Sequence, residues 1–237
     1  MTEPAPPISG LLVIDKPIGP SSMKACAIVR AKLRRGGAPK RVKVGHGGTL
    51  DPLASGVLVV LCGRATKLCD RVMAGEKRYV AKVDLSAFSD TDDREGARRP
   101  VRVAGPPTDD AIRAALRGFV GEIDQVPPAY SAIKVGGRRA YALARAGAPP
   151  DLAPRRVEIH AIAALGYAWP MLTLGVRCGK GVYIRSLARD VGHALGTGGM
   201  LAGLRRTAVG RFAIEDATTI DELPESLTQS DLEPPEA

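Results

Sequence analysis

A chain of 237 residues is long enough to bury a sizeable core, and 45% hydrophobic with 25% charged residues is ordinary for a globular protein. No apolar run reaches the length of a membrane span, and the first residues have neither the basic nor the apolar region of a signal peptide. The four cysteines are scattered through apolar stretches. This predicts reduced thiols in a cytoplasmic protein and argues against a disulfide or zinc framework.

Positive charge is concentrated in most of the chain and absent from its end. No Lys or Arg follows Arg211, whereas eight acidic residues lie between Glu215 and Ala237. Residues 1–211 therefore carry 34 basic against 17 acidic side chains, and residues 30–43 contain seven bases and no acid. Charge of one sign on this scale predicts a polyanionic partner, and nucleic acid is the first candidate. Aromatic residues make up only 4% of the chain, which argues against a surface of stacked single-stranded bases.

Apolar periodicity predicts strands mixed with helices. In the first half we expect strands at 10–14, 57–61 and 77–85, and helices at 21–35, 65–73 and 108–119. In the second half we expect strands at 130–135, 156–165, 171–178 and 207–214, and helices at 138–146, 185–195 and 200–204. No internal repeat and no regular βαβ rhythm is present. The pattern favours an α+β fold with a mixed, largely antiparallel sheet flanked by helices.

Composition also suggests the domain boundaries. We expect a disordered N-terminus over residues 1–9, a single folded domain over 10–225 and a disordered acidic tail over 226–237. The polar stretch from Ser89 to Gly96 is turn-like, and its acids are spaced somewhat as in a calcium loop. Because the bidentate acid that closes such a loop is missing, we predict no metal site there.

The best candidate for a reactive group is Asp51, which lies in the glycine-dense segment Gly45–Gly56 just before an apolar strand. Taken alone, an Asp before Pro is more often a helix cap or turn residue than a catalytic one. The rest of the chain has only three histidines, no cysteine pair at metal spacing and no phosphate-binding loop. Other parts of the sequence must therefore decide what Asp51 does.

Seven ordered blocks between about residues 10 and 213 together resemble the TruB family of tRNA pseudouridine synthases. The Gly45–Gly56 segment resembles the catalytic motif of the family, and Lys77-Arg78-Tyr79 resembles its Lys-x-Tyr motif. The remaining blocks are the opening strand and helix from Gly10 to Ser22, the Thr91–Gly96 loop, the Gln125–Lys134 segment, Cys178–Arg185 and Leu204-Arg205-Arg206. Gly47, Gly179 and Val182 depart from the usual residues of the family and remove hydroxyl groups.

This resemblance implies a pseudouridine synthase fold with a thumb-like RNA-binding insertion at about 125–152, in a short form without the C-terminal PUA-type domain. It implies an isomerase that cleaves the bond between uracil N1 and ribose and rejoins the base through C5, a reaction that needs no cofactor and no metal. Asp51 would be the catalytic carboxylate, Arg185 would pair with it and keep it ionised, and Tyr79 would pack on the target base.

The resemblance also implies contacts with the substrate. His46 would enter the RNA where the target uridine is flipped out, and Ile184 and Leu204 would line an apolar pocket. Phosphate contacts are expected from six basic residues, of which Arg138 and Arg139 belong to the continuation of the thumb-like segment: Lys16, Lys77, Arg138, Arg139, Arg205 and Arg206. The implied substrate is uridine-55 in the T stem-loop of tRNA, bound by a monomer without guide RNA or membrane.

Two alternatives stay open at this point. One is a guide-RNA-dependent relative, the catalytic subunit of a box H/ACA particle, although Leu53-Ala54 and the thumb-like segment favour the stand-alone type. The other is an RNA-binding or RNA-folding factor that keeps the scaffold without the chemistry. The presence of Asp51, Tyr79 and Arg185 together argues against that second alternative.

Overall fold

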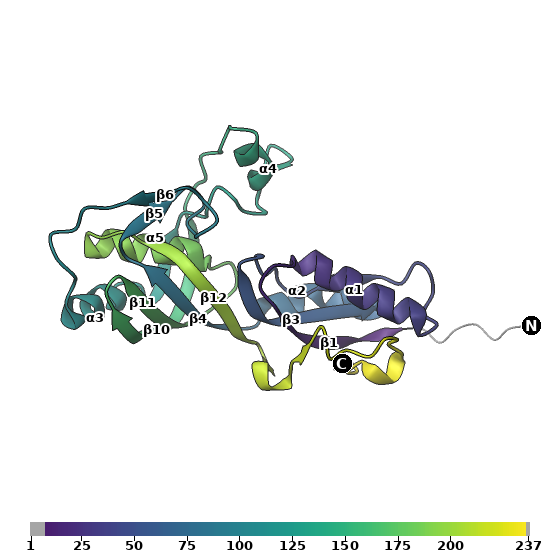
Figure 1. Ribbon diagram of the computed structural model, residues 1–237. Coiled ribbons are helices and arrows are strands. Elements are labelled where there is room, and N and C mark those ends of the chain that lie inside the picture. The colour runs from purple at the N-terminus through teal and green to yellow at the C-terminus, as the bar shows by residue number, and fades with distance from the viewer. Residues whose placement is uncertain (1–7, 236–237) are drawn as a thin grey trace, which may run out of the picture. The chain divides into compact units, whose positions relative to one another are not determined.

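The computed structural model describes residues 8–235, which form two compact units (Figure 1). Unit 1 contains the chain up to Arg78 together with the chain from Arg205 onward, and unit 2 is the continuous stretch Tyr79–Leu204. Along the chain, strands β4 (Lys77–Asp84) and β12 (Met200–Val209) run across the boundary between the units. The expected single domain over 10–225 contains parts of both units.

Unit 1 is a mixed sheet covered by helix α1. Its strand order is β14-β1-β3-β12, with β1 antiparallel to β3 and parallel to β14, while β2 adds to β3 and β13 to β12. The elements are β1 (Ser9–Lys16), α1 (Ser22–Arg35), β2 (Val44–His46), β3 (Ala54–Gly63), η1 (Arg64–Leu68), α2 (Cys69–Ala74), β13 (Phe212–Ala213), η2 (Ile214–Asp216), β14 (Thr218–Thr219) and η3 (Gln229–Asp231).

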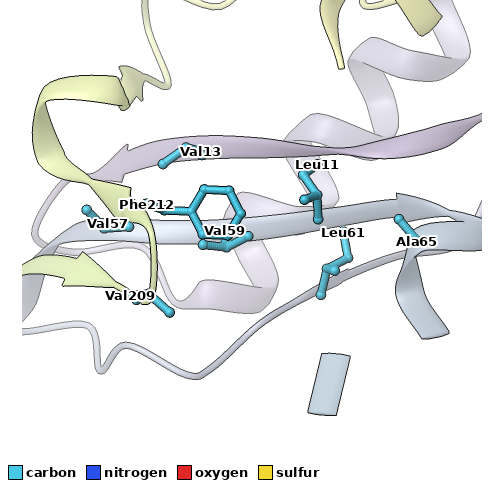
Figure 2. Close-up of a cluster of buried hydrophobic side chains, with 8 residues drawn as sticks. All are labelled: Leu11, Val13, Val57, Val59, Leu61, Ala65, Val209 and Phe212. Atoms are coloured by element: carbon cyan, nitrogen blue, oxygen red, sulfur yellow. The ribbon is translucent and has the colours of Figure 1, made fainter. Parts of the chain in front are cut away.

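The core of unit 1 follows from the pairing of β1 with β3. Leu11 is opposite Leu61 and Val13 is opposite Val59, so alternate residues of both strands meet on one face. Figure 2 shows these side chains with Phe212 over them in one buried cluster; the complete cluster is Leu11, Val13, Val57, Val59, Leu61, Ala65, Val209 and Phe212. The intervening residues of β3 are buried as well, which explains why the strand reads as an unbroken apolar run.

Helix α1 begins and ends on specific contacts. The Ser21 side chain accepts a hydrogen bond from Lys24 N, which satisfies one free amide of the first turn. At the other end, Leu227 N donates to Lys32 O, and the Lys32 ammonium donates to the carbonyls of Leu223 and Pro224. A Cβ at Gly36 would lie 2.0 Å from the Leu227 carbonyl oxygen, so this C-cap glycine allows the later segment to approach. Residues near the end of the chain therefore cap the first helix.

The segment 226–235 is ordered in the described structure, and the prediction of disorder from residue 226 is wrong for these residues. Leu227 and Leu232 are buried, Glu233 pairs with Leu11 of β1, and the Gln229 side chain hydrogen-bonds both backbone groups of Ser9. The burial of these apolar side chains orders the segment despite its acidic composition. Of the N-terminus expected to be disordered, residues 1–7 lie outside the described range, whereas Ile8 is buried and β1 begins at Ser9.

Truncating one of these anchors provides a test. Leu227→Ala is expected to lower the free energy of unfolding by about 2–4 kcal/mol, since it removes a fully buried side chain and leaves a cavity. Urea unfolding followed by circular dichroism measures the change. The control is Leu165→Ala, because Leu165 is 61% exposed and its truncation should cost less than about 1 kcal/mol. Equal stabilities of the Leu227 variant and the parent protein would show that the segment does not contribute.

Unit 2 has the strand order β12-β4-β11-β10-β7, with β10 antiparallel to both β11 and β7. Helix α3 contacts β10 and α5. The apolar face of α5 is buried, as expected from its periodicity. The elements are β5 (Ala87–Ser89), β6 (Arg98–Pro100), α3 (Asp109–Arg117), β7 (Gly121–Gln125), β8 (Lys134–Val135), β9 (Arg138–Arg139), α4 (Ala140–Arg145), β10 (Arg155–Ala168), β11 (Met171–Cys178) and α5 (Ile184–Leu195).

The α+β prediction with a mixed, largely antiparallel sheet is confirmed, and some elements differ from expectation. Residues 200–204 form the first half of β12, not a helix, because a five-residue apolar run carries too little periodicity to separate the two. Strands β2 and β7 were not expected, and only Lys134–Val135 of the strand predicted at 130–135 forms. Within residues 8–235, no helix is both long and apolar enough to cross a membrane.

Candidate active site

Asp51 lies in unit 1 on the turn Gly47–Leu53, hereafter the Asp51 turn, which connects β2 to β3. The Ser22 hydroxyl fixes the middle of the turn, since its oxygen accepts from Leu50 N and donates to Leu50 O, both at 2.8 Å. Gly47 N donates to Val59 O and Gly19 N donates to Pro52 O, each at 2.8 Å. These bonds leave the half-buried Asp51 side chain on a backbone anchored at several points.

Arg206 braces the same turn from inside unit 1. Its side chain is 2% exposed, and its guanidinium donates to three carbonyls: Val57 at 2.8 Å, Gly48 at 3.1 Å and Thr49 at 3.2 Å. A Cβ at Gly56 would lie 2.1 Å from the Arg206 carbonyl oxygen, and the φ of +105° at Gly56 also favours glycine. The glycine therefore permits β3 and β12 to approach where the arginine enters.

Lys16 is a second buried cation near Asp51. Its side chain is fully buried, and Nζ donates to Pro17 O at 2.7 Å and Pro20 O at 3.0 Å. Burial lowers the pKa of Lys16 to about 8, with the negative charge of Asp51 opposing and the positive charge of Arg206 adding to that shift. Lys16 and Arg206 do not present their charges at the surface. The prediction that they contact phosphate is therefore wrong, and they support the Asp51 turn instead.

The burial of Lys16 predicts a pH dependence of stability. Its folded-state pKa of about 8 lies below the ordinary value of 10.5, so between these values the unfolded state binds more protons and stability rises with pH. Burial raises the pKa values of Cys26 and Cys62 to about 11 and 12, which acts in the opposite direction above pH 9. The quantity to measure is therefore the difference in free energy of unfolding between the parent protein and Lys16→Met. This difference should rise in favour of the parent from pH 8 to pH 10, and a flat difference would contradict the assignment.

His46 ends β2 next to the Asp51 turn. Burial, and secondarily the charge of Arg206, lowers the pKa of its imidazole, which keeps the ring neutral near pH 7. Among the described residues its buried Nδ1 finds no hydrogen-bond partner. A buried ring nitrogen without a partner is uncommon in folded proteins, which marks His46 as a candidate for function.

Gly47, where relatives usually have Thr, also has a structural reason. A Cβ at this position would lie 2.3 Å from Cγ1 of Val72 in α2. Glycine and Val72 are thus matched to each other, and the missing hydroxyl is compatible with the local packing of unit 1.

In unit 2, Arg185 is the centre of a buried cluster. It is 6% exposed at the start of α5 and donates to Tyr130 O at 3.0 Å and Thr91 O at 3.2 Å. Its Nη1 lies 3.6 Å from Asp93 Oδ2, and the other oxygen of Asp93 accepts from Thr91 Oγ1 at 2.5 Å. A role for Asp93 was not predicted from the sequence, although this acid lies within the Thr91–Gly96 block.

Gln125 is a second residue that the sequence analysis missed. Its side-chain amide accepts from Tyr183 N at 2.8 Å and donates to Tyr183 O at 3.2 Å, which fixes the residue that precedes α5. The only available signal was its place at the start of the thumb-like block.

The other predicted residues are distributed over both units. In unit 2, Tyr79 on β4 and Leu204 on β12 are half-buried, Ile184 is buried, and Arg138 and Arg139 on β9 are exposed. In unit 1, Lys77 is buried and donates to Met73 O, and Arg205 forms an ion pair with Asp15 at 2.7 Å. Unit 1 therefore brings together Lys16, His46, Asp51 and Arg206, while Arg185 lies with Asp93 in unit 2.

Comparison with known families decides which family this arrangement belongs to. Residues 34–184 match the model of the TruB family pseudouridylate synthase N-terminal domain, and residues 185–234 match the tRNA pseudouridylate synthase B C-terminal domain. The chain belongs to the TruB family. As a member it is a pseudouridine synthase, which is an isomerase, of the tRNA pseudouridine synthase B type.

Relatives of this TruB-family chain include tRNA pseudouridine synthase B of Gluconacetobacter diazotrophicus, 50% identical over 92% of this chain and 69% of the relative. The enzyme of the same name from Novosphingobium aromaticivorans is 46% identical over 91% of this chain and 72% of the relative. Among solved structures, a Cbf5-Nop10-Gar1 complex contains a chain similar to this one with a TM-score of 0.69 and 31% identity, covering 90% of this chain and 53% of that one.

Proposed function

We propose that this protein converts uridine-55 in the T-arm loop of tRNA to pseudouridine by base flipping and an Asp51-dependent cleavage and re-formation of the glycosidic bond. The observation that carries the proposal is the Asp51 turn. It presents one half-buried carboxylate, held by Ser22 and Arg206, beside a neutral imidazole whose Nδ1 lacks a partner. The names of the relatives supply the tRNA substrate.

The proposed reaction places three requirements on the protein. It must extract the target base from folded RNA, at a cost of a few kcal/mol, and fill the gap that is left. It must cleave the bond between N1 and ribose, and it must hold the detached uracil until C5 bonds to the same carbon and releases its proton. In this proposal His46 enters the RNA where the base has left the stack, and Asp51 supplies the nucleophile or base.

Roles for residues of unit 2 rest on the family resemblance. Tyr79 is proposed to pack on the base, Arg185 to stabilise the ionised form of Asp51, and Ile184 and Leu204 to exclude water. Arg138 and Arg139, together with Arg205 of unit 1, keep their proposed phosphate contacts because their side chains are at least partly exposed. We also propose a cytoplasmic monomer, which fits the four free cysteines.

A direct test incubates the purified protein, without added cofactor, with an unmodified T stem-loop RNA. Pseudouridine is then located by carbodiimide labelling and primer extension. We expect product at the single loop uridine that corresponds to position 55. Product at another position would contradict the uridine-55 assignment, and absence of product on both the stem-loop and whole tRNA would contradict the stand-alone activity.

A second candidate is a subunit that depends on a guide RNA, favoured by the similarity to the Cbf5-Nop10-Gar1 structure. Another solved structure with a similar chain, at a TM-score of 0.65 and 28% identity, is described as an H/ACA RNP bound to a substrate RNA. The same assay separates the two candidates, because a guide-dependent enzyme would modify the RNA only after a matching guide RNA and partner proteins are added.

A further inference from the structure

Unit 1 contains a hollow of about 520 Å³ beside β2, and no residue of the Asp51 turn lines it. Four basic side chains line it, Arg30 and Arg34 from α1 and Arg41 and Lys43 from the segment that leads into β2, together with Val42, Val44, Gly45 and Thr66. We call these eight residues the basic hollow. No acidic residue lines it. A Cβ built at Gly45 would meet no atom within 4 Å, so this part of the lining is open.

The guanidinium groups of Arg30 and Arg34 in the basic hollow each donate to a backbone carbonyl. Arg30 and Arg34 are one helical turn apart and project from the same side of α1. Arg30 donates to Val44 O at 2.9 Å, and Arg34 donates to Lys40 O. Each contact uses part of one guanidinium fork, which has five N–H donors in total. The remaining donors are oriented by a fixed framework and are free to meet an anion.

These charges have no internal counter-ion. Among residues 8–235, none of Arg30, Arg34, Arg41 and Lys43 forms an ion pair with a carboxylate. Two other basic residues of α1 do have partners. Arg35 pairs with Glu225, and Lys32 binds carbonyls of the C-terminal segment. Four like charges in one hollow repel each other, which an anion from outside would relieve.

The hollow is continuous with the Asp51 turn along β2. Val44 and Gly45 line it, His46 follows in the same strand, and the turn begins at Gly47. At about 3.3 Å per residue, the lining lies within one or two nucleotides of the turn. We propose that the basic hollow binds backbone phosphates of the RNA strand whose uridine enters at the Asp51 turn. This proposal rests on the proposed function and adds a second anchoring point for the same substrate.

The test compares two triple variants with equal charge loss. The first is Arg34→Gln/Arg41→Gln/Lys43→Gln in the hollow. The control is Arg102→Gln/Arg113→Gln/Arg117→Gln, three exposed residues in or near α3 of unit 2. Affinity for an unmodified T stem-loop RNA is measured from 50 to 300 mM KCl. Each phosphate contact contributes about 0.7–0.9 to the slope of log K against log salt, so the hollow variant should lower that slope by roughly 2–3 and the control by less than about 0.5.

Three results would overturn the proposal. The first is an unchanged salt slope for the hollow variant, and the second is an equal loss of slope in both variants. The third, from a parallel measurement with tripolyphosphate as a free-anion probe, is that the hollow variant loses tripolyphosphate binding while its RNA binding stays unchanged. The last result would assign the hollow to a free anion. The pseudouridine assay on the parent protein keeps the two proposals apart. Product with an unchanged slope would refute only the hollow, whereas a reduced slope without any product would refute the isomerase and leave the hollow in place.

Discussion

Asp51→Asn is expected to reduce pseudouridine formation by at least about 10⁴-fold while leaving RNA affinity within about threefold of the parent protein. Asn has nearly the same shape but is neither a nucleophile nor a base at this position, and removing such a group from a covalent mechanism has effects of this size. The anchors of the turn are backbone and Ser22 contacts that do not involve the carboxylate, so the fold should persist. Single-turnover assays with enzyme in excess measure the rate, and filter binding measures affinity.

The matched control is Asp70→Asn, which makes the same change at an exposed position in α2 of unit 1. It should turn over at the parental rate. Normal turnover by the Asp51 variant would refute the mechanism. If neither the parent nor the variant forms product while both bind RNA, the chain is an RNA-binding factor and not a catalyst.

Arg206→Met is expected to lower the free energy of unfolding by about 3–5 kcal/mol and to slow turnover well beyond the loss explained by unfolding. The variant leaves the carbonyls of Gly48, Thr49 and Val57 buried without a donor, and each such group costs about 1–3 kcal/mol. Without its brace, the Asp51 turn samples positions in which the carboxylate is misplaced, and small displacements of a reacting group reduce rates strongly. Urea unfolding gives the stability, and single-turnover kinetics under folded conditions give the rate.

Two further variants separate positioning from general destabilisation. Arg206→Lys keeps a buried cation but can reach fewer carbonyls, so it should recover part of the stability and less of the rate. Arg205→Met removes the neighbouring, partly exposed arginine and its ion pair with Asp15, and should cost less than about 1 kcal/mol. A turnover rate of Arg206→Met equal to that of the parent, once corrected for the folded fraction, would show that Arg206 has no positioning role.

The sequence was sufficient to predict the segments whose local signals agree. Helix α1 has a Ser cap and a clear apolar face, and the glycine pattern marked the Asp51 turn as rigid. The roles of Arg205 and Arg206 could not be separated in this way. Adjacent residues of a strand point to opposite faces, but nothing local says which face is buried. Only the folded unit shows that Arg206 points inward and Arg205 remains partly exposed.

Composition averaged over a window was misleading at the C-terminal segment. Its acidic residues predicted disorder, whereas two spaced leucines, Leu227 and Leu232, are buried. Lys16 is a second case in which residue type was misleading. A lysine at the end of a strand is normally exposed to solvent, but this one is buried. Its burial depends on carbonyls of Pro17 and Pro20 that turn back over the ammonium, which is a property of the folded loop.

The discontinuity of unit 1 has a consequence for biosynthesis. The Asp51 turn is translated early, but Arg206, which braces it, and Leu227, which caps α1, follow only after the whole of unit 2. At about 5–20 residues per second, roughly 8–30 s separate the synthesis of Asp51 from that of Arg206. Unit 2 is continuous and can fold on the ribosome during this interval, whereas unit 1 must wait for its last strands. We therefore expect a nascent chain to lack the brace of the Asp51 turn until translation has passed β12.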